Sequence, residues 1–363
     1  MKRLLKRLQP LIGFAISVVL VYLVLFSPQL GKFFTGDLNL LDALFGDPRI
    51  GLADLQTAWS SLNPIPALFG VLLLMGTLFL RTWRWRLIIN QIGPAPYWTV
   101  FHGVNVGYLL NNVLPLRAGE LLRAVIVAQR SGVSRAAVLS TVVAERVFDM
   151  AGLGIVFGVV TFLFPFPDWL QTVGLSFAGA VLLVLVVSLM LAKSVDRLTR
   201  WHQAIGKRGK VVRKIGETVL SLVEGLSVLK SPMAMVHVLW STLALWACYI
   251  TTMKLVLDAF QLTNGTYPAL AGQAWMPAAA MTVITSLGFA IPSAPGGVGT
   301  YHAAVLLGLS WFDVPEGMGV IFATVMHAMN YLTLTLWGVI SLFAMKLKFS
   351  DIVRTARSSS DSE

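Results

Sequence analysis

Residues 105–123 read NVGYLLNNVLPLRAGELLR, and this stretch decides how the rest of the chain is interpreted. It places Arg117, Glu120 and Arg123 inside apolar sequence, close to Pro115. An ionised side chain deep in hydrocarbon costs about 2.5 to 3.5 kcal/mol on insertion scales, so these charges must face protein or water. Proline breaks a helix because it lacks the backbone N–H and clashes with the preceding turn. The stretch predicts a hairpin that enters and leaves the membrane by one face, with a cytosolic loop between two spans as the alternative.

The composition around this stretch is that of a polytopic membrane protein. Of the 363 residues, 56% are hydrophobic and 12% are charged, whereas about 25% are charged in soluble domains. The formal net charge is +11, but the basic residues lie in short runs between apolar blocks, as in cytoplasmic loops beside anionic lipids. This distribution argues against nucleic-acid binding. The single cysteine, Cys248, cannot form an intrachain disulfide.

Apolar blocks and loop charges predict an all-α polytopic membrane protein with about six spanning helices and two broken re-entrant hairpins. The predicted spans are residues 11–27, 64–80, 137–164, 170–192, 233–257 and 317–345. The first hairpin has arms at 97–113 and 118–130. The second hairpin occupies residues 268–309 and is interrupted by two prolines and three glycines at 291–299.

The second predicted span ends in basic residues interleaved with tryptophans. These residues are Arg81, Trp83, Arg84, Trp85 and Arg86. Basic and aromatic side chains gather where a span meets the cytoplasmic surface of a membrane. We therefore expect them to form an interface belt.

Charge in the loops orients the predicted spans. Nine Lys or Arg lie from residue 193 to residue 230 against three acids, which marks this loop as internal. Acidic loops at 28–63 and around Asp313 are predicted to be external. We expect an inner-membrane protein with both termini in the cytoplasm and an uncleaved N-terminal signal anchor. Residues 215–229 have apolar side chains at helical spacing, which fits an amphipathic helix on the inner leaflet or packing against the bundle.

Residues 1–345 are predicted to form one transmembrane domain, followed by a basic and then serine-rich tail at 346–363. Its halves, 11–164 and 170–345, share the order span, span, broken hairpin, span. Three crossings per half would invert the second half relative to the first. Inverted repeats of this kind bring interrupted segments together at the binding site of several secondary transporters.

Two groups of charged residues are candidates for binding. They are Arg117, Glu120 and Arg123 in the first hairpin, and Glu145, Arg146 and Asp149 in the third predicted span. The spacing within each group favours a shared helix face, and a guanidinium there can hold a phosphate through two hydrogen bonds. The six residues form either a closed set of ion pairs that locks the hairpin or a site for an anionic substrate.

The break in the second hairpin is a candidate anion site. Its residues are Pro295, Gly296, Gly297 and Gly299. Backbone N–H groups at a glycine-rich helix start can bind an anion, although glycines also permit close helix packing. His302 follows them, with pH sensing, substrate contact and a buried structural role all open. No ligand spacing links the histidines, so we predict no metal, and no cofactor motif is present.

Together these patterns resemble the flippase-like membrane family related to the transmembrane half of lysylphosphatidylglycerol synthetases. The matching residues are Leu114-Pro115-x-Arg117-x-Gly119-Glu120-x-x-Arg123, Glu145-Arg146-x-x-Asp149 and Pro295-Gly296-Gly297-x-Gly299. The resemblance covers about residues 64–345, with His302 where many relatives place a glutamate. The chain ends where the fused synthetases would begin an aminoacyltransferase domain, so the resemblance implies lipid translocation rather than lipid aminoacylation.

We therefore expect a protein without enzymatic activity that binds an anionic lipid of the phospholipid, polyprenyl or hopanoid type and moves it between leaflets. Arg117 and Arg123 would receive the phosphate, while the three acids would balance charge or carry protons. Its partners would be this membrane lipid and the anionic lipids of the inner leaflet. One alternative is an accessory subunit of a lipid-modifying or glycosylation enzyme in the membrane. Another is a membrane-embedded transferase with Glu145 or Asp149 as its base.

Overall fold

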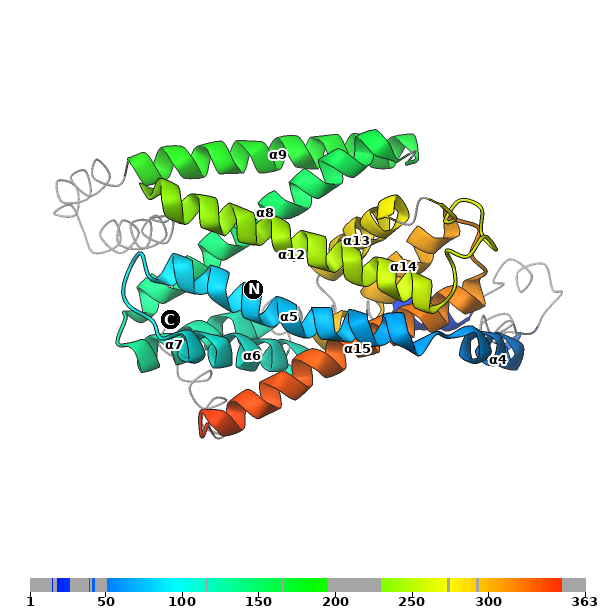
Figure 1. Ribbon diagram of the computed structural model, residues 1–363, viewed down its shortest axis with the longest axis horizontal. Coiled ribbons are helices and arrows are strands. Elements are labelled where there is room, and N and C mark those ends of the chain that lie inside the picture. Colours follow the sequence, from blue (N-terminus) through cyan, green and yellow to red (C-terminus); the bar gives the residue numbers. More distant parts are fainter. Residues whose placement is uncertain are drawn as a thin grey trace. The chain divides into compact units, whose positions relative to one another are not determined.

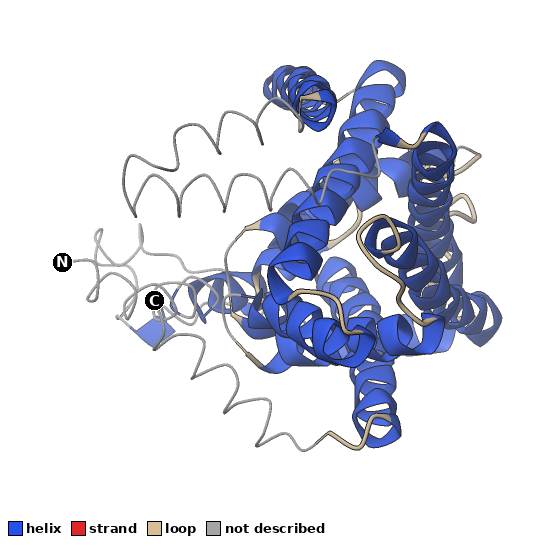
Figure 2. Ribbon diagram, turned by 90° about the vertical axis from the view of Figure 1, so that its left-hand side faces the viewer, coloured by secondary structure: helices blue, strands red, loops and turns tan. Residues whose placement is uncertain are grey.

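The computed structural model describes residues 15, 18–26, 39, 41–42, 51–114, 117–164, 166–194, 230–272, 275–291 and 294–347. Figure 2 shows helices joined by loops throughout these residues, which confirms the predicted all-α polytopic fold. In chain order the helices are α4 (Leu52–Ser61), α5 (Pro64–Ile89), α6 (Tyr97–Val113), α7 (Ala118–Ser131), α8 (Arg135–Leu163), α9 (Asp168–Lys193), α12 (Pro232–Ala259), α13 (Trp275–Ala290), η4 (Pro295–Gly297), α14 (Thr300–Ser310) and α15 (Glu316–Ala344).

Five helices within the described residues are long and apolar enough to cross a bilayer, namely α5, α8, α9, α12 and α15. The last four begin and end within two residues of their predicted bounds. Of the predicted span at 11–27, the structure describes residues 15 and 18–26, and residues 18–25 are helical. The helix predicted at 215–229 and most of the tail at 346–363 lie outside the described residues.

Helix α5 is longer than the sequence predicted. It continues nine residues beyond residue 80, because the apolar residues 87–89 follow its basic stretch and pack inside the protein. Arg84 and Trp85 are buried, with 1% and 0% of their surface exposed. The predicted interface belt is therefore wrong for these two residues, which face protein.

The chain forms two compact units. Unit 1 comprises residues 1–74, 112–116 and 249–333, and unit 2 comprises residues 75–111, 117–248 and 334–363. The helices α5, α6, α12 and α15 each supply residues to both units. Each unit combines segments from both predicted halves, and the inverted repeat stays a prediction.

Within unit 2, the first hairpin closes through direct backbone contact between α6 and α7. A Cβ atom added to Gly119 would lie 2.0 Å from the carbonyl oxygen of Gly107, so a side chain there has no room. A buried apolar core joins this hairpin to α5 and α8. Its residues are Trp85, Ile89, Ala95, Val100, Val104, Ala124, Val127, Ala128, Val138 and Val142. This packing fixes the face that α7 presents to α8.

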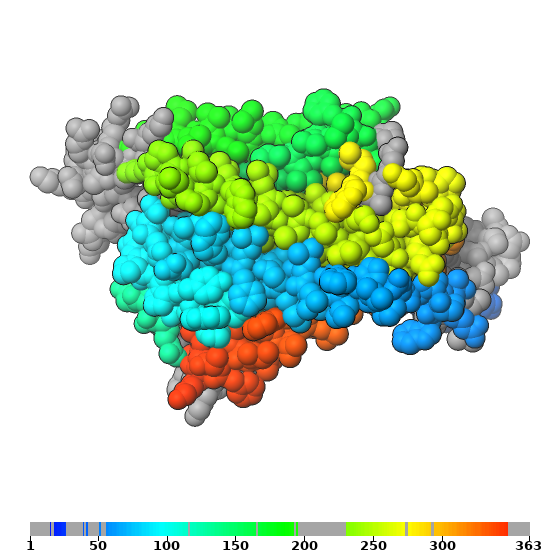
Figure 3. Space-filling view, viewed as in Figure 1, coloured from blue at the N-terminus to red at the C-terminus, as the bar shows by residue number. Residues whose placement is uncertain are grey.

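Helices α8 and α9 form a second packed pair in unit 2. A Cβ atom added to Gly154 of α8 would lie 3.0 Å from Val181 of α9, so the two helices pack closely. Figure 1 shows them meeting at the turn that joins them. The other side of α9 exposes Leu182, Leu183 and Met190, and Figure 3 shows this helix as an uncovered green surface. Such an apolar surface suits contact with lipid.

Within unit 1, the second hairpin consists of α13 and α14 with the predicted break between them. Gly296, Gly297 and Gly299 have φ angles of 74°, 75° and 90°. Glycine adopts this left-handed region without a Cβ penalty, so the three residues allow the chain to reverse. The interruption of the second hairpin is thus confirmed.

Candidate functional site

Six charged side chains of unit 2 form what we call the ion cluster. They are Arg84 of α5, Glu120 and Arg123 of α7, and Glu145, Arg146 and Asp149 of α8. Five of these residues were predicted as candidates from the sequence. The cluster connects the returning arm of the first hairpin to two spanning helices.

The buried half of the cluster consists of Arg84, Arg123 and Glu145, whose side chains are 1%, 3% and 1% exposed. Glu145 accepts from both arginines, at 3.2 Å from Arg84 Nη2 and 2.6 Å from Arg123 Nη2. One carboxylate thus serves two guanidinium groups, with a different oxygen facing each. Because all three are shielded from water, removing Glu145 would take this acid from the buried Arg123 and would leave Arg84 with Asp149 as its carboxylate partner.

Neutral side chains complete the surroundings of the buried arginines. Arg84 Nη1 donates to Thr242 Oγ1 at 3.2 Å. The guanidinium of Arg123 lies 4.4 Å from the ring centre of Trp85, whose Nε1 donates to Thr141 Oγ1 at 3.0 Å. A cation over an aromatic face is attracted by the ring quadrupole. Arg123 is therefore held by protein groups on two sides, and its role as a phosphate ligand stays a prediction.

The exposed half of the cluster consists of Glu120, Arg146 and Asp149, whose side chains are 20%, 32% and 18% exposed. Arg146 Nε lies 3.2 Å from Glu120 Oε2, and Arg146 Nη1 lies 3.0 Å from Asp149 Oδ2. The other oxygen of Asp149 lies 2.5 Å from Arg84 Nη2 and so joins the two halves. Arg146 is the most exposed arginine of the cluster.

Arg117, the first of the predicted candidates, lies just before α7. It precedes α7 as the N-cap residue in a left-handed conformation, with φ 54° and ψ 36°, and it is exposed. Arg117 therefore does not share a helix face with Glu120 and Arg123, because it precedes the first helical residue, Ala118. Arg84, which was not predicted, adds a further arginine to the predicted set of charges.

Sequence reasoning missed Arg84 as a site residue. Its tryptophan neighbours resembled an interface belt, and the helix was expected to end before it. The apolar residues 87–89 beyond the arginines were the available signal, because they show that the hydrophobic segment resumes.

In unit 1, the glycine break contacts a histidine of α15. His327 Nε2 lies 2.9 Å from the carbonyl oxygen of Gly296, so this nitrogen carries a proton and donates. The N–H of Gly297 donates to Ala294 O at 3.0 Å and is used within the turn. This bond removes one of the backbone donors expected for an anion, while the roles of Pro295, Gly296 and Gly299 stay predictions.

His302 lies on α14 beside His327, with 5.0 Å between the ring centres. Its Nδ1 atom is buried and has no hydrogen-bond partner among the described residues. Tyr301 and Phe289 pack against His327. His302 itself adjoins the rings of Tyr301 and His327, and these contacts do not decide among its three predicted roles.

Tyr331 of α15 contacts both hairpins within unit 1. Its hydroxyl donates to Asn112 O, and its carbonyl oxygen accepts from Asn112 Nδ2, both at 3.4 Å. A Cβ atom on Gly296 would meet the Tyr331 ring at 2.9 Å. The tip of the first hairpin and the break of the second therefore share one aromatic residue.

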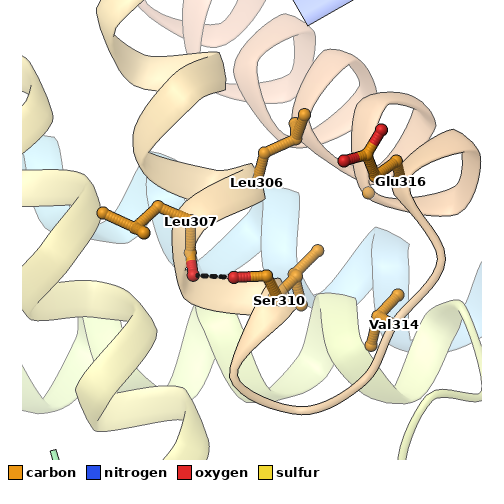
Figure 4. A pocket seen from close by; sticks show the side chains of 7 residues that line it. Leu306, Leu307, Ser310, Val314 and Glu316 are labelled. Carbon is orange, nitrogen blue, oxygen red and sulfur yellow. Dashed lines mark hydrogen bonds between the residues drawn. The ribbon is translucent and has the colours of Figure 1, made fainter. Parts of the chain in front are cut away.

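A surface cavity of about 180 Å³ lies between α14 and α15 in unit 1, as Figure 4 shows. It is lined mainly by apolar residues, namely Leu306, Leu307, Leu309, Val314 and Gly319, together with Ser310 and Glu316. The hydroxyl of Ser310 donates to Leu307 O at 2.8 Å and is already satisfied. The cavity offers no group that would orient a phosphate.

Comparison with known proteins finds two membrane-protein relatives and one family model. The UPF0104 membrane protein MJ1595 of Methanocaldococcus jannaschii is 21% identical over 311 residues, covering 82% of this chain and 90% of the relative. A UPF0104 membrane protein of Methanothermobacter thermautotrophicus is 24% identical over 317 residues, covering 81% and 89%. No solved structure matches the chain significantly. The family model described as the lysylphosphatidylglycerol synthase TM region matches residues 10–338, and the chain belongs to this family of membrane proteins.

Proposed function

We propose that this membrane protein binds the phosphate of an anionic lipid at Arg146 and moves the lipid between leaflets. The observation that carries the proposal is the unequal exposure of the ion cluster, in which Arg146 is accessible while Arg84 and Arg123 are not. A planar guanidinium holds phosphate oxygens through paired hydrogen bonds, which suits this ligand. The lipid would be a phospholipid or a polyprenyl-type phosphate lipid.

Exchange of partners would release Arg146 for the ligand. Its contact with Glu120 is 3.2 Å long and joins side chains that are 32% and 20% exposed, so replacing this carboxylate by a phosphate should cost less than in the buried half. Asp149 would stay in place, because it also bonds Arg84. The proposal therefore assigns Glu120 as the exchangeable acid and requires no catalytic step.

Purified protein in vesicles tests this proposal. Fluorescent phosphatidylglycerol in the inner leaflet should become accessible to an external quencher faster than in protein-free vesicles. Labelled phosphatidylcholine, which carries no net charge, should move more slowly. The matched variants are Arg146→Gln and Arg135→Gln, because both remove an arginine of α8 but residue 135 is exposed and outside the cluster. Equal rates with and without protein would overturn the proposal, since an accessory subunit moves no lipid alone.

The proposal also includes the cytoplasmic membrane as the location, with both termini inside. It rests on loop charge, because basic loops stay in the cytoplasm. A cysteine at Asp313 should react with an impermeant reagent added outside the cell, and one at Arg208 should not. The reverse labelling would overturn this topology.

A further inference from the structure

The connection between α5 and α6 contains a second basic feature of unit 2. A surface cavity of about 500 Å³ lies there. Its lining residues are Arg86, Asn90, Gly93, Pro94, Ala95 and Pro96. Among these six residues the charged side chain is Arg86, and none carries a carboxylate. The lining is therefore positively charged.

One hydrogen bond fixes the orientation of Arg86. Its Nε donates to the carbonyl oxygen of Ala95 at 2.9 Å. A guanidinium is planar and has five N–H donors, so this bond sets its plane and uses one donor. For the four donors on the two terminal nitrogens, no partner is seen within the described part of the chain. A second acceptor can therefore bind them.

Asn90 is oriented by the same residue. The backbone N–H of Ala95 donates to Asn90 Oδ1 at 3.1 Å. The oxygen of this amide is thus occupied, and its NH₂ group is the part left to bind a ligand. Both backbone groups of Ala95 are used by these two side chains. What the cavity offers is a set of donors, which is complementary to a ligand that only accepts.

The position of the cavity adds to its preference for an anion. Helix α6 begins at Tyr97, immediately after the lining residue Pro96, and the start of a helix carries partial positive charge. Trp98 in the same turn is 60% exposed. Exposed tryptophans at the end of a membrane helix are typical of the lipid headgroup region.

We propose that Arg86 and Asn90 bind a phosphate group in this cavity, supplied by an anionic lipid of the adjacent leaflet. The site is separate from the ion cluster, where each arginine already bonds a carboxylate. It would hold a lipid at the membrane surface, and this binding does not depend on the proposed transport.

Asn90→Asp is the sharpest variant for testing this site. The new carboxylate keeps an acceptor for the Ala95 N–H, so the turn is retained. It replaces the NH₂ donor with a negatively charged oxygen that repels phosphate. We expect native mass spectrometry of the full-length protein to show about tenfold weaker retention of phosphatidic acid, as loss of a charge-assisted hydrogen bond implies. Retention of phosphatidylcholine should not change.

Two further variants and one further ligand complete the experiment. Arg86→Gln should also lose phosphatidic acid, whereas Arg135→Gln, which removes an exposed arginine outside the cavity, should retain it. Inorganic phosphate could instead stabilise the protein against unfolding while Asn90→Asp leaves lipid retention unchanged. That result would mean that the source is a soluble phosphate and would overturn the lipid assignment. If Asn90→Asp and Arg86→Gln both bind phosphatidic acid and inorganic phosphate as the wild type does, the site itself is overturned.

Discussion

The buried and exposed halves of the ion cluster contain the same kinds of side chain in different surroundings. Arg84, Arg123 and Glu145 are shielded from water, whereas Glu120, Arg146 and Asp149 reach it. A buried arginine cannot exchange its acid without a large penalty, because the charge has no water to replace it. A partly exposed arginine such as Arg146 can exchange its acid at a smaller cost, because water reaches it. Burial thus separates residues that hold the fold from residues that are able to bind a ligand.

The largest expected effect belongs to the buried half. Glu145→Gln removes the carboxylate that serves both Arg84 and Arg123, so it should lower the free energy of unfolding by about 3 to 5 kcal/mol. Chemical unfolding of the purified protein in detergent would measure the change. Glu120→Gln is the matched control, because it makes the same substitution in the exposed half. Equal losses in the two variants would break the distinction between the halves.

A smaller effect is expected at the residue that joins the halves. Asp149→Asn weakens contacts to Arg84 and Arg146 and should cost about 1.5 to 3 kcal/mol. If Asp149 paired with Arg146 alone, adding Arg146→Gln would restore stability fully. The contact between Arg84 and Asp149 now predicts only partial recovery, because Arg84 stays without this acid. A double-mutant cycle measures the coupling, and full recovery would show that this contact contributes nothing.

The smallest effect on stability is expected in the exposed half. Glu120→Gln should change the free energy of unfolding by less than about 1 kcal/mol. It should also strengthen retention of labelled phosphatidylglycerol, because the carboxylate no longer competes with the lipid for Arg146. Binding titrations in nanodiscs would measure this. Weaker lipid binding in the variant would indicate that Glu120 supports the ligand rather than competing with it.

The sequence predicted most of the membrane helices well, because long apolar runs have few ways to fold. The arms of the first hairpin were predicted at 97–113 and 118–130, and α6 and α7 occupy Tyr97–Val113 and Ala118–Ser131. The break of the second hairpin followed from its prolines and glycines. These features are local, so a single sequence is enough to show them.

The pairing of charges could not be predicted in the same way. The contact between Arg84 and Glu145 joins residues 61 positions apart, and no local pattern connects them. The left-handed conformation of Arg117 was also hidden, because a non-glycine residue rarely adopts it. Gly119 shows the same limit, since its role depends on Gly107 in another helix. Long-range packing decided which of the predicted site residues became buried.

The most direct test of the account is the transport rate per folded molecule of the double variant Arg146→Gln with Glu120→Gln. Both substitutions lie in the exposed half and cancel in charge, so the melting temperature should stay close to that of the wild type. Movement of labelled phosphatidylglycerol should fall about tenfold or more, because the accessible guanidinium is lost. A wild-type rate in folded double variant would contradict the assignment of Arg146 as the phosphate-binding residue.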